Sequence, residues 1–359
     1  MKKRYGIGIL VGLLCILFLT ACSQEHDSRN LLEEPYQEEE FLLGTYTKIR
    51  IYDEGKKAAL KPAFDRIEEL GDKITINQAG SEIDAINEQA GVKPVKVSKD
   101  VYGLLQKAYE YSDQSEAGFN MAIGAITQLW RIGFDDAKKP TQTEIDEALK
   151  HIDYHQVIFN DQEQTVYLED EQMLLDLGAI AKGYIADEVV KVLQEQEVTT
   201  AIIDLGGNVF VMGNSPRGEA VPWNVGIQDP NEARGSVIGT VQESNKTVVT
   251  SGIYERYLEV DGQKYHHIFD SKTGYPIDNE LASVSIITDS SLDADALTTL
   301  VFSKGLEAGL AYVENQAPAG TQAIFVTKDD RVYLTQGLQD NFQLAKDSNY
   351  TLGDVSEIK

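Results

Sequence analysis

The amino-acid sequence predicts an α+β protein whose strands pair in hairpins, with helices flanking mixed or antiparallel sheets. Paired β-type runs enclose short polar or glycine turns at 157–168, 199–213 and 257–270. Segments with helical spacing of apolar residues come in groups and do not alternate regularly with strands, which disfavours a doubly wound parallel sheet. We expect one large domain or two closely packed domains.

Each element is predicted from its local pattern. Apolar residues spaced three or four apart indicate a helix over 56–70. Thr141 and Glu144 have the spacing of a capping box, and Asp261-Gly262 is a strong signal for a hairpin turn. The other expected elements are a strand over 41–52 broken at Gly44, helices over 82–89, 99–112 and 293–303, a short helix ending near 150, a strand over 283–287 and a hairpin over 323–335.

The first 21 residues have the pattern of a bacterial export signal. Lys2, Lys3 and Arg4 precede the apolar run 7–19, which is too short to span a bilayer comfortably. "LTAC", residues 19–22, resembles a lipobox, so we expect cleavage before Cys22 and diacylation of its thiol; the cysteine disfavours an uncleaved anchor or an ordinary signal peptide. Two acyl chains would hold the protein on the cell membrane, facing away from the cytoplasm.

The chain then divides into a signal peptide (1–21), an acidic flexible tether (22–40), a main domain (41–345) and a C-terminal tail (346–359). The only cysteines are Cys15 and Cys22, so the mature chain would have no free thiol for a disulfide, a nucleophile or a zinc ligand. Loss of three cationic residues changes the formal charge from −26 to −29, which argues against nucleic acid as a ligand. An anionic substrate would need a local cation.

Two glycine-containing segments offer backbone groups to a ligand. In "DLGAIAKGYIAD", residues 176–187, a strand end leads into a helix, where turn N–H groups and Lys182 could receive a phosphate. Taken alone, a packed turn with a solvated lysine explains this segment slightly better. "DLGGN", residues 204–208, allows close approach of a ligand, although a bulge or tight turn is the more common reason for paired glycines.

The segment "DADALTT", residues 293–299, offers a metal half-site. Asp295 and Thr299 lie four apart, so a helix places them on one face, and a carboxylate with a hydroxyl suits Mg²⁺. The alternative is simple stabilisation of a helix N-terminus by aspartates, which fits Asp293 better than Asp295.

The segment "KYHHIFDSKTGYP", residues 264–276, holds two of the five histidines. Adjacent residues of a strand point to opposite faces, so His266 and His267 cannot both bind one metal ion while the strand stays regular. This disfavours zinc, which wants three or four converging protein ligands.

Together these motifs resemble the ApbE family of flavin transferases, from about Phe41 to about Leu334. They come in family order: "LGTYTKIRI", "NQAGSEIDAIN", "DLGAIAKGY", "DLGGNVFVMG", "TSGIYERY", "HHIFDSKTGYP" and "ADALTT". Leu43 stands where the family commonly has methionine, and Ser271 replaces the proline of its usual Asp-Pro. The resemblance implies an ApbE-like fold similar to a T-fold. It also implies transfer of FMN from FAD to a Thr or Ser hydroxyl of an exported acceptor protein through a phosphoester, with release of AMP.

The resemblance also implies the site residues. The carbonyl of Ala179 and the side chains of Asp295 and Thr299 would bind Mg²⁺, and Lys182 would face the FAD diphosphate. His267 would take the acceptor's proton or bind phosphate, and would be catalytic together with Asp295 and Lys182. Five further positions would line the flavin or the adenosine, or close over them: Leu43, Asn208, Ser251, Gly252 and Asp270.

Two other functions would use the same pocket. A Mg²⁺-dependent FAD pyrophosphatase would let water attack in place of the acceptor hydroxyl, releasing free FMN and AMP. A lipoprotein that only binds flavin would need no metal half-site, so the "ADALTT" segment argues against it. Analysis of the products that form without an acceptor protein distinguishes the pyrophosphatase from the transferase. Turnover of FAD to AMP excludes a protein that only binds flavin.

Overall fold

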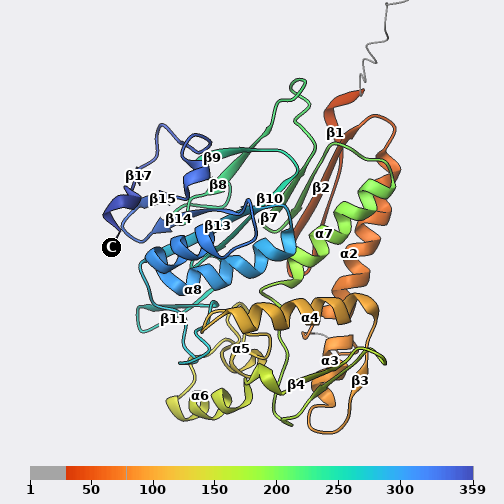
Figure 1. Cartoon of the computed structure of the whole chain (residues 1–359), viewed down its shortest axis with the longest axis vertical. Helices are drawn as coiled ribbons and strands as arrows, with labels where there is room; N and C mark the ends of the chain where they lie inside the picture. The colour runs from red at the N-terminus through yellow and green to blue at the C-terminus, as the bar shows by residue number, and fades with distance from the viewer. Residues whose placement is uncertain (1–29, 78, 359) are drawn as a thin grey trace, which may run out of the picture.

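The computed structural model describes residues 30–77 and 79–358. Its centre is a nine-stranded sheet in the order β1-β2-β6-β7-β10-β13-β14-β15-β17 (Figure 1). Every neighbouring pair is antiparallel except β15 and β17. Two three-stranded sheets, β3-β5-β4 and β16-β9-β8, and the hairpin β11-β12 complete the strands. The predicted α+β class is confirmed.

The strands of the large sheet are β1 (Leu31–Leu42), β2 (Thr45–Asp53), β6 (Ala201–Leu205), β7 (Asn208–Met212), β10 (Lys246–Gly252), β13 (Leu281–Thr288), β14 (Gln322–Thr327), β15 (Arg331–Leu334) and β17 (Thr351–Leu352). The other strands are β3 (Val95–Lys96), β4 (Val157–Asn160), β5 (Thr165–Leu168), β8 (Trp223–Gln228), β9 (Val237–Glu243), β11 (Tyr257–Val260), β12 (Gln263–His266) and β16 (Gln343–Leu344). The helices are α2 (Leu60–Ile74), α3 (Glu82–Glu88), α4 (Lys99–Gln114), α5 (Gly124–Trp130), α6 (Gln142–Ala148), α7 (Ala181–Glu195) and α8 (Ser291–Asn315).

Residues 31–40 do not belong to a flexible tether, and that prediction is wrong. They form most of β1, an edge strand that pairs with β2 as far as the Leu43-Gly44 turn. Tyr36 and Leu42 pack against the main core, and Glu39 forms an ion pair with Lys48 of β2 (2.9 Å). The many acidic residues of this segment made it look like a flexible chain. An edge strand can carry charged side chains at its exposed positions, so charge does not exclude a strand here. Cys22 and the predicted signal peptide lie outside the described residues.

The predicted tail 346–359 also belongs to the fold, at least as far as residue 358. β17 pairs with β15, and the buried Tyr350 donates its hydroxyl to Asp229 (2.7 Å). A two-residue strand carries no readable periodicity, so local pattern could not predict it.

Three helices, α2, α7 and α8, cover one face of the large sheet (Figure 1). Their apolar side chains and those of the strands beneath form the main core, which continues without a break into α3, α4 and β5. A second core lies on the opposite face of the sheet, between it and β8-β9. The helices predicted over 56–70, 82–89 and 99–112, the capping box at Thr141 and the hairpins are all confirmed.

Helix α8 is longer than predicted because two helical segments join at Gly305, whose φ is +73°. On one side of the break Asn279 donates to the Phe302 carbonyl (2.7 Å). On the other side Glu280 accepts from the N–H of Leu306 (2.5 Å). Because these two side chains satisfy helix-end groups on both sides, the chain can bend there without leaving them unpaired.

A smaller lobe of α3, α5, α6 and β3-β5-β4 lies below α4 in Figure 1. A separate apolar cluster here surrounds Trp130 of α5, whose indole N–H donates to the carbonyl of Gly274 (2.9 Å). Tyr265 and Phe269, on either side of the histidine pair, stack against the Trp130 ring at 5.4 and 5.8 Å between centroids. The segment that carries His267 is therefore fixed to the smaller lobe.

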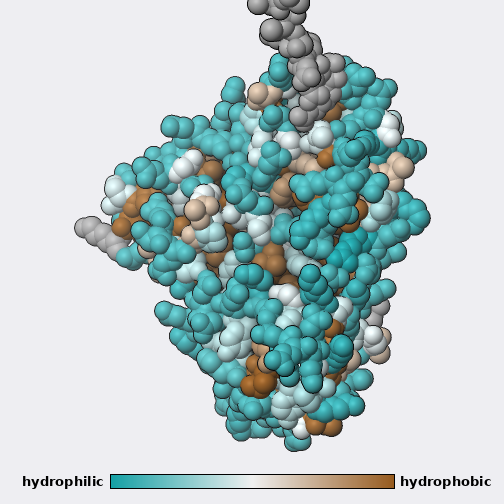
Figure 2. Space-filling view, turned by 45° about the vertical axis from the view of Figure 1, so that its right-hand side comes forward, coloured by the Kyte–Doolittle hydropathy of each residue, from teal (hydrophilic) through white to brown (hydrophobic). Residues whose placement is uncertain are grey.

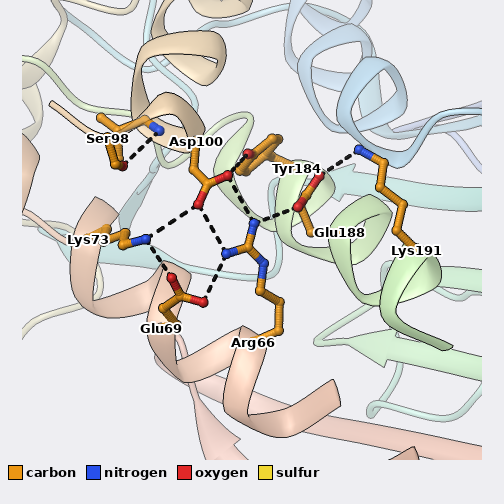
Figure 3. Close-up of polar contacts among 9 residues, drawn as sticks. Arg66, Glu69, Lys73, Ser98, Asp100, Tyr184, Glu188 and Lys191 are labelled. Carbon is orange, nitrogen blue, oxygen red and sulfur yellow. Dashed lines mark hydrogen bonds and ion pairs between the residues drawn. The ribbon is translucent and has the colours of Figure 1, made fainter. Parts of the chain in front are cut away.

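An ion-pair network joins α7 to α2 and α4 (Figure 3). Arg66 of α2 donates two hydrogen bonds to Asp100 of α4 (3.0 and 3.1 Å) and one to Glu188 of α7 (2.6 Å). The Arg66 guanidinium lowers the pKa of Asp100 below its usual range. Tyr184 of α7 also donates to Asp100 (3.4 Å). These contacts fix the outer side of α7, which is the helix that follows the "DLGA" turn.

On the face shown in Figure 2, hydrophilic residues predominate and hydrophobic ones form small separate groups. No helix among residues 30–77 and 79–358 is long and apolar enough to cross a membrane.

Candidate active site

Three turns or strand ends that carry predicted ligand contacts meet at one end of the large sheet. The strand register places Thr47, Leu205, Asn208 and Val249 in one row across β2, β6, β7 and β10. The Leu43-Gly44 turn, the Gly206-Gly207 turn and the Ser251-Gly252 strand end all lie just beyond that row. The sheet therefore brings together Leu43, Asn208, Ser251 and Gly252, which are far apart in the sequence.

Leu43 adopts a left-handed conformation, with φ of +54°. Its side chain lies against α2, where a Cβ added to Gly71 would come within 2.8 Å of the Leu43 Cδ2. A larger residue at position 71 would displace Leu43, so the tight turn and the glycine together hold this side chain at the sheet end.

Asn208 is buried with neither amide atom paired. It is 1% exposed, and its Oδ1 and Nδ2 have no hydrogen-bond partner in the part of the chain that the structure describes. The hydroxyl of Thr47, in the same row, is also buried and unpartnered. Buried polar groups are nearly always hydrogen-bonded, so two such groups in one row indicate a place for a polar ligand. Sequence reasoning did not single out Thr47.

Helices α7 and α8 pack against each other on one face of the sheet, and α8 reaches this end at Thr298, which contacts Ser251. Asp295 of α8 is 3% exposed, and it accepts from the N–H of Gly183 of α7 (2.9 Å). Its other oxygen lies 3.4 Å from the Lys182 ammonium. The structure thus brings Lys182 and Asp295 together from 113 positions apart, with the cation at the surface and the carboxylate beneath it.

The Ala179 carbonyl, just before α7, is free. Ile180 is the N-cap of α7, so Gly183 lies in the first turn, where backbone N–H groups have no acceptor within the helix. The Gly183 N–H finds its acceptor in Asp295. Among the described residues no donor reaches the Ala179 carbonyl, whereas the Ile180 carbonyl accepts from Tyr184 (3.1 Å). A free carbonyl one turn before the contact with a buried carboxylate matches the oxygen ligands that Mg²⁺ prefers.

Gly183 itself is a functional residue that sequence reasoning missed. A Cβ at this position would lie 2.1 Å from the Ser291 carbonyl oxygen and 2.7 Å from the Asp295 Cβ. No side chain fits there, so the two helix backbones can touch only at a glycine. The glycine was visible in "AKGY", but its partner helix was not.

The third expected metal ligand, Thr299, lies one turn after Asp295 and is partly exposed. Its neighbour Thr298 is buried and donates to the Asp295 carbonyl (2.7 Å), and its hydroxyl lies 2.8 Å from that of Ser251. This contact ties α8 to the end of β10. No group of three or more His, Cys, Asp or Glu residues able to hold a metal occurs in the described residues. The oxygen set at this joint contains a single carboxylate, so it would have to be completed by substrate oxygens or water.

The two adjacent histidines have different environments. His266, at the end of β12, is buried, and its Nε2–H donates to the Ile277 carbonyl (2.8 Å) while its Nδ1 accepts from the Ile268 N–H (3.3 Å). Both of its ring nitrogens are therefore used by the fold.

Within the described residues, Nδ1 of His267 has one partner, the carbonyl of Arg256 (3.2 Å), and Nε2 has none. A carbonyl can only accept, so Nδ1 carries the hydrogen and Nε2 keeps a lone pair. Desolvation, together with the smaller effect of the nearby cations Arg256 and Lys182, lowers the pKa of His267 to about 4. The ring is therefore neutral at pH 7.

Asp270 is used at least partly by its own loop. One carboxylate oxygen accepts from the N–H groups of Lys272 (2.7 Å) and Thr273 (3.3 Å). The adjacent N–H of Ser271 donates to the carbonyl of Ala117 (2.8 Å), which anchors the loop. The geometry accounts for Asp270 as a loop cap, and its contact with a cofactor stays a prediction. A hollow of about 310 Å³ lies elsewhere, beside Arg217 and Gln242 on the β8-β9 sheet, and shares no residue with this site.

The fold and this joint place a buried carboxylate, a free carbonyl and a lysine beside a sheet end with unpartnered polar groups. Comparison with known proteins gives the family. The profile of the ApbE family matches residues 43–325, so the chain belongs to the ApbE family. A relative from Klebsiella pneumoniae (strain 342), named FAD:protein FMN transferase, is 39% identical over 88% of this chain and 96% of its own. A Treponema pallidum (strain Nichols) protein of the same name is 36% identical over 95% of this chain and 96% of its own. The crystal structure of the ApbE protein of Thermotoga maritima superposes with a TM-score of 0.78 at 28% identity, covering 86% of this chain and 99% of that one.

Replacing Asn208 with leucine should separate stability from ligand binding. Leucine has the same branching and removes two unpaired buried polar atoms, so the ligand-free protein should gain about 1 kcal/mol of unfolding free energy. Affinity for FAD should fall at least about tenfold. Urea unfolding and a fluorescence titration with FAD measure the two effects. The matched control is Asn120→Leu, which should destabilise the protein because the Asn120 amide pairs with Ile152 and Ala122. Equal destabilisation by both variants, with FAD affinity unchanged, would contradict the assignment.

The His267 ring should stay neutral well below its ordinary pKa of 6.5. As the pH falls from 6.5 towards 4, the unfolded chain takes up a proton at this position and the folded chain does not. His267 therefore leaves the free energy of unfolding unchanged above pH 6.5 and lowers it progressively as the pH falls from 6.5 towards 4. An NMR titration of the imidazole signals, assigned by their loss in His267→Gln, checks this. A midpoint near 6.5 in the folded protein would contradict it.

Proposed function

We propose that this protein is an FAD:protein FMN transferase that requires Mg²⁺. Membership of the ApbE family and the printed names of its relatives support the reaction class. The observation in this chain that carries the proposal is the joint between α7 and α8. There a free carbonyl, a buried carboxylate and a lysine come from "DLGAIAKGY" and "ADALTT", over a sheet end with an unpartnered asparagine.

The proposed reaction exchanges one phosphorus–oxygen bond for another. The hydroxyl oxygen of a Thr or Ser in the acceptor protein attacks the phosphorus of the FMN half of FAD, and the bond from that phosphorus to AMP breaks. The hydroxyl proton is lost, and AMP leaves with the displaced oxygen. Such a transfer depends more on alignment and charge neutralisation than on a strong protein nucleophile.

The chain's own residues would bind and orient the diphosphate. The Lys182 ammonium, 3.4 Å from Asp295, supplies the local cation that a strongly acidic protein needs for an anionic substrate. Asn208 would hold the cofactor through its amide, and Leu43 would contact a ring. The neutral His267 offers the Nε2 lone pair, which could hold the acceptor's proton or accept a hydrogen bond from that hydroxyl.

Ala179 through its carbonyl, and Asp295 and Thr299 through their side chains, would hold the metal. Mg²⁺ at this joint would neutralise charge on the diphosphate and on the departing AMP. The oxygen-only chemistry of these groups suits Mg²⁺ and does not suit zinc.

The proposal is tested by incubating the full mature chain with FAD, Mg²⁺ and an exported acceptor protein, followed by intact-mass measurement of the acceptor. The expected gain is the mass of one FMN less one water, with AMP formed in equal amount. Asp295→Ala should abolish the gain by weakening Mg²⁺ binding, because it removes the buried carboxylate at the joint. Free FMN with no labelled acceptor would show a pyrophosphatase instead. An inactive Asp295→Ala with normal Mg²⁺ affinity would refute the metal role of Asp295.

We also propose that the protein is anchored to the outer side of the cell membrane through lipid on Cys22. The "LTAC" pattern and the apolar run before it support this. Cys22→Ser should move the protein from the membrane fraction to the soluble fraction, because it removes both acyl chains. An unchanged membrane fraction would contradict lipidation at this residue.

A further inference from the structure

Asp187, at the end of "DLGAIAKGYIAD", joins the two helices of the site. It lies on α7, one turn after Gly183, and its carboxylate accepts three hydrogen bonds from the start of α8. The donors are the N–H of Ser291 (2.7 Å), the N–H of Leu292 (3.0 Å) and the hydroxyl of Ser290 (3.0 Å). A side chain of one helix thus caps the N-terminus of the other.

The residue of α8 that Asp187 contacts lies one helical turn before Asp295, the carboxylate of the proposed metal site. Ser291 and Asp295 are four residues apart on α8, and Gly183 and Asp187 are four apart on α7. Each pair therefore lies on one face of its helix, one turn apart, and the two faces meet. At the first level Gly183 donates to Asp295 (2.9 Å), and at the second Asp187 accepts from Ser291. Sliding α8 by one residue would break both contacts.

Contacts with β10 also hold α8, at Ser291 and at Thr298. The Ser291 hydroxyl donates to Thr247 of β10 (2.9 Å), which holds the helix start on the sheet. Ser290 also caps α8 by accepting from Asp293 (3.2 Å), but that bond lies within α8 and its cap, and does not reach α7. Among the residues described, the side chains of α7 that reach the α8 helix through hydrogen bonds are those of Lys182 and Asp187.

We propose that Asp187 is a positioning residue for the metal site: it fixes the register of α8 on α7, and thereby sets where the Asp295 carboxylate lies relative to the Ala179 carbonyl and Lys182. The inference rests on the proposed metal role of Asp295. Asp187 does not touch the metal or the substrate. Its effect on the site is through geometry.

A second explanation would be purely electrostatic. Asp187 carries negative charge near the site, and burial raises its pKa while the donors from α8 oppose that rise. Asp293, in the first turn of α8, carries the same kind of charge at the same helix end. Its carboxylate accepts from Tyr111 of α4 (2.7 Å), and it makes no hydrogen bond to α7 among the described residues. Asp293→Asn is therefore a matched control that changes charge without changing the register between the two helices.

The test measures Mn²⁺ binding to the full mature chain by electron paramagnetic resonance, with saturating ADP present. Asp187→Asn should raise the Mn²⁺ dissociation constant at least about tenfold, because amide hydrogens would oppose the N–H groups of α8. Asp187→Glu keeps the charge and remains able to cap, but lengthens the link by one methylene, and it should also weaken binding. Asp293→Asn should stay within about twofold of the wild type.

Thermal unfolding separates loss of the cap from loss of position. Without metal, the midpoint of each variant reports the helix cap and overall folding. The increase in midpoint on adding Mn²⁺ with ADP reports the metal site, and it should shrink only for the Asp187 and Asp295 variants.

Equal weakening by Asp187→Asn and Asp293→Asn would overturn the proposal in favour of charge. Wild-type Mn²⁺ affinity in both Asp187 variants would overturn it outright. If the wild type shows no Mn²⁺ site that Asp295→Asn removes, the metal role in the proposed function fails first. If Asp295→Asn removes the Mn²⁺ site but both Asp187 variants bind Mn²⁺ as tightly as the wild type, the proposed metal role of Asp295 stands and the positioning role of Asp187 is refuted.

Discussion

The contact between Gly183 and Asp295 is the interaction on which the rest of the site depends. Two helix backbones can approach this closely only where one residue has no side chain. A Cβ at Gly183 would lie 2.1 Å from the Ser291 carbonyl oxygen, so the approach leaves no space even for a methyl group. The same contact gives an acceptor to a first-turn N–H of α7 that has none within the helix. The Ala179 carbonyl just before that turn accepts from no donor among the described residues, so close helix packing and a free oxygen occur at the same place.

The surroundings of this contact hold α7 from both sides. On the outer side Arg66 joins Glu188 of α7 to Asp100 of α4 (Figure 3), and on the inner side Asp187 caps α8. The register of the sheet below brings the unpartnered Thr47 and Asn208 into one row. The smaller lobe supplies the histidine segment, which Trp130 anchors through the Gly274 carbonyl. The candidate site forms where these parts meet.

Much of the fold and some of the site could be predicted from sequence, where the signal was local. Helical spacing predicted that Asp295 and Thr299 share a helix, and α8 contains both. Strand alternation predicted that His266 and His267 point to opposite faces, but β12 ends at His266, so alternation does not reach His267. The two rings still differ: both nitrogens of His266 are used by the fold, whereas Nε2 of His267 has no partner among the described residues. The pair Asp261-Gly262 has positive φ at both residues, as a tight hairpin turn requires.

The remainder depended on contacts between distant segments. The strand β1 was missed because its acidic residues lie on an exposed edge, and its partner β2 is what makes it a strand. Gly183 and Asp187 were within a recognised motif, but their roles depend on α8, more than a hundred residues later. The unpartnered state of Asn208 and Thr47 is a property of the packed structure, and no sequence pattern carries it.

In the proposed function, the metal and the diphosphate bind together at the joint between α7 and α8. Anomalous diffraction from crystals of the protein grown with Mn²⁺ and ADP tests this most directly. One strong manganese peak is expected, bounded by the Ala179 carbonyl, Asp295 and Thr299, with the diphosphate beside Lys182. A manganese peak at the histidine segment, or a diphosphate bound away from this joint, would contradict it.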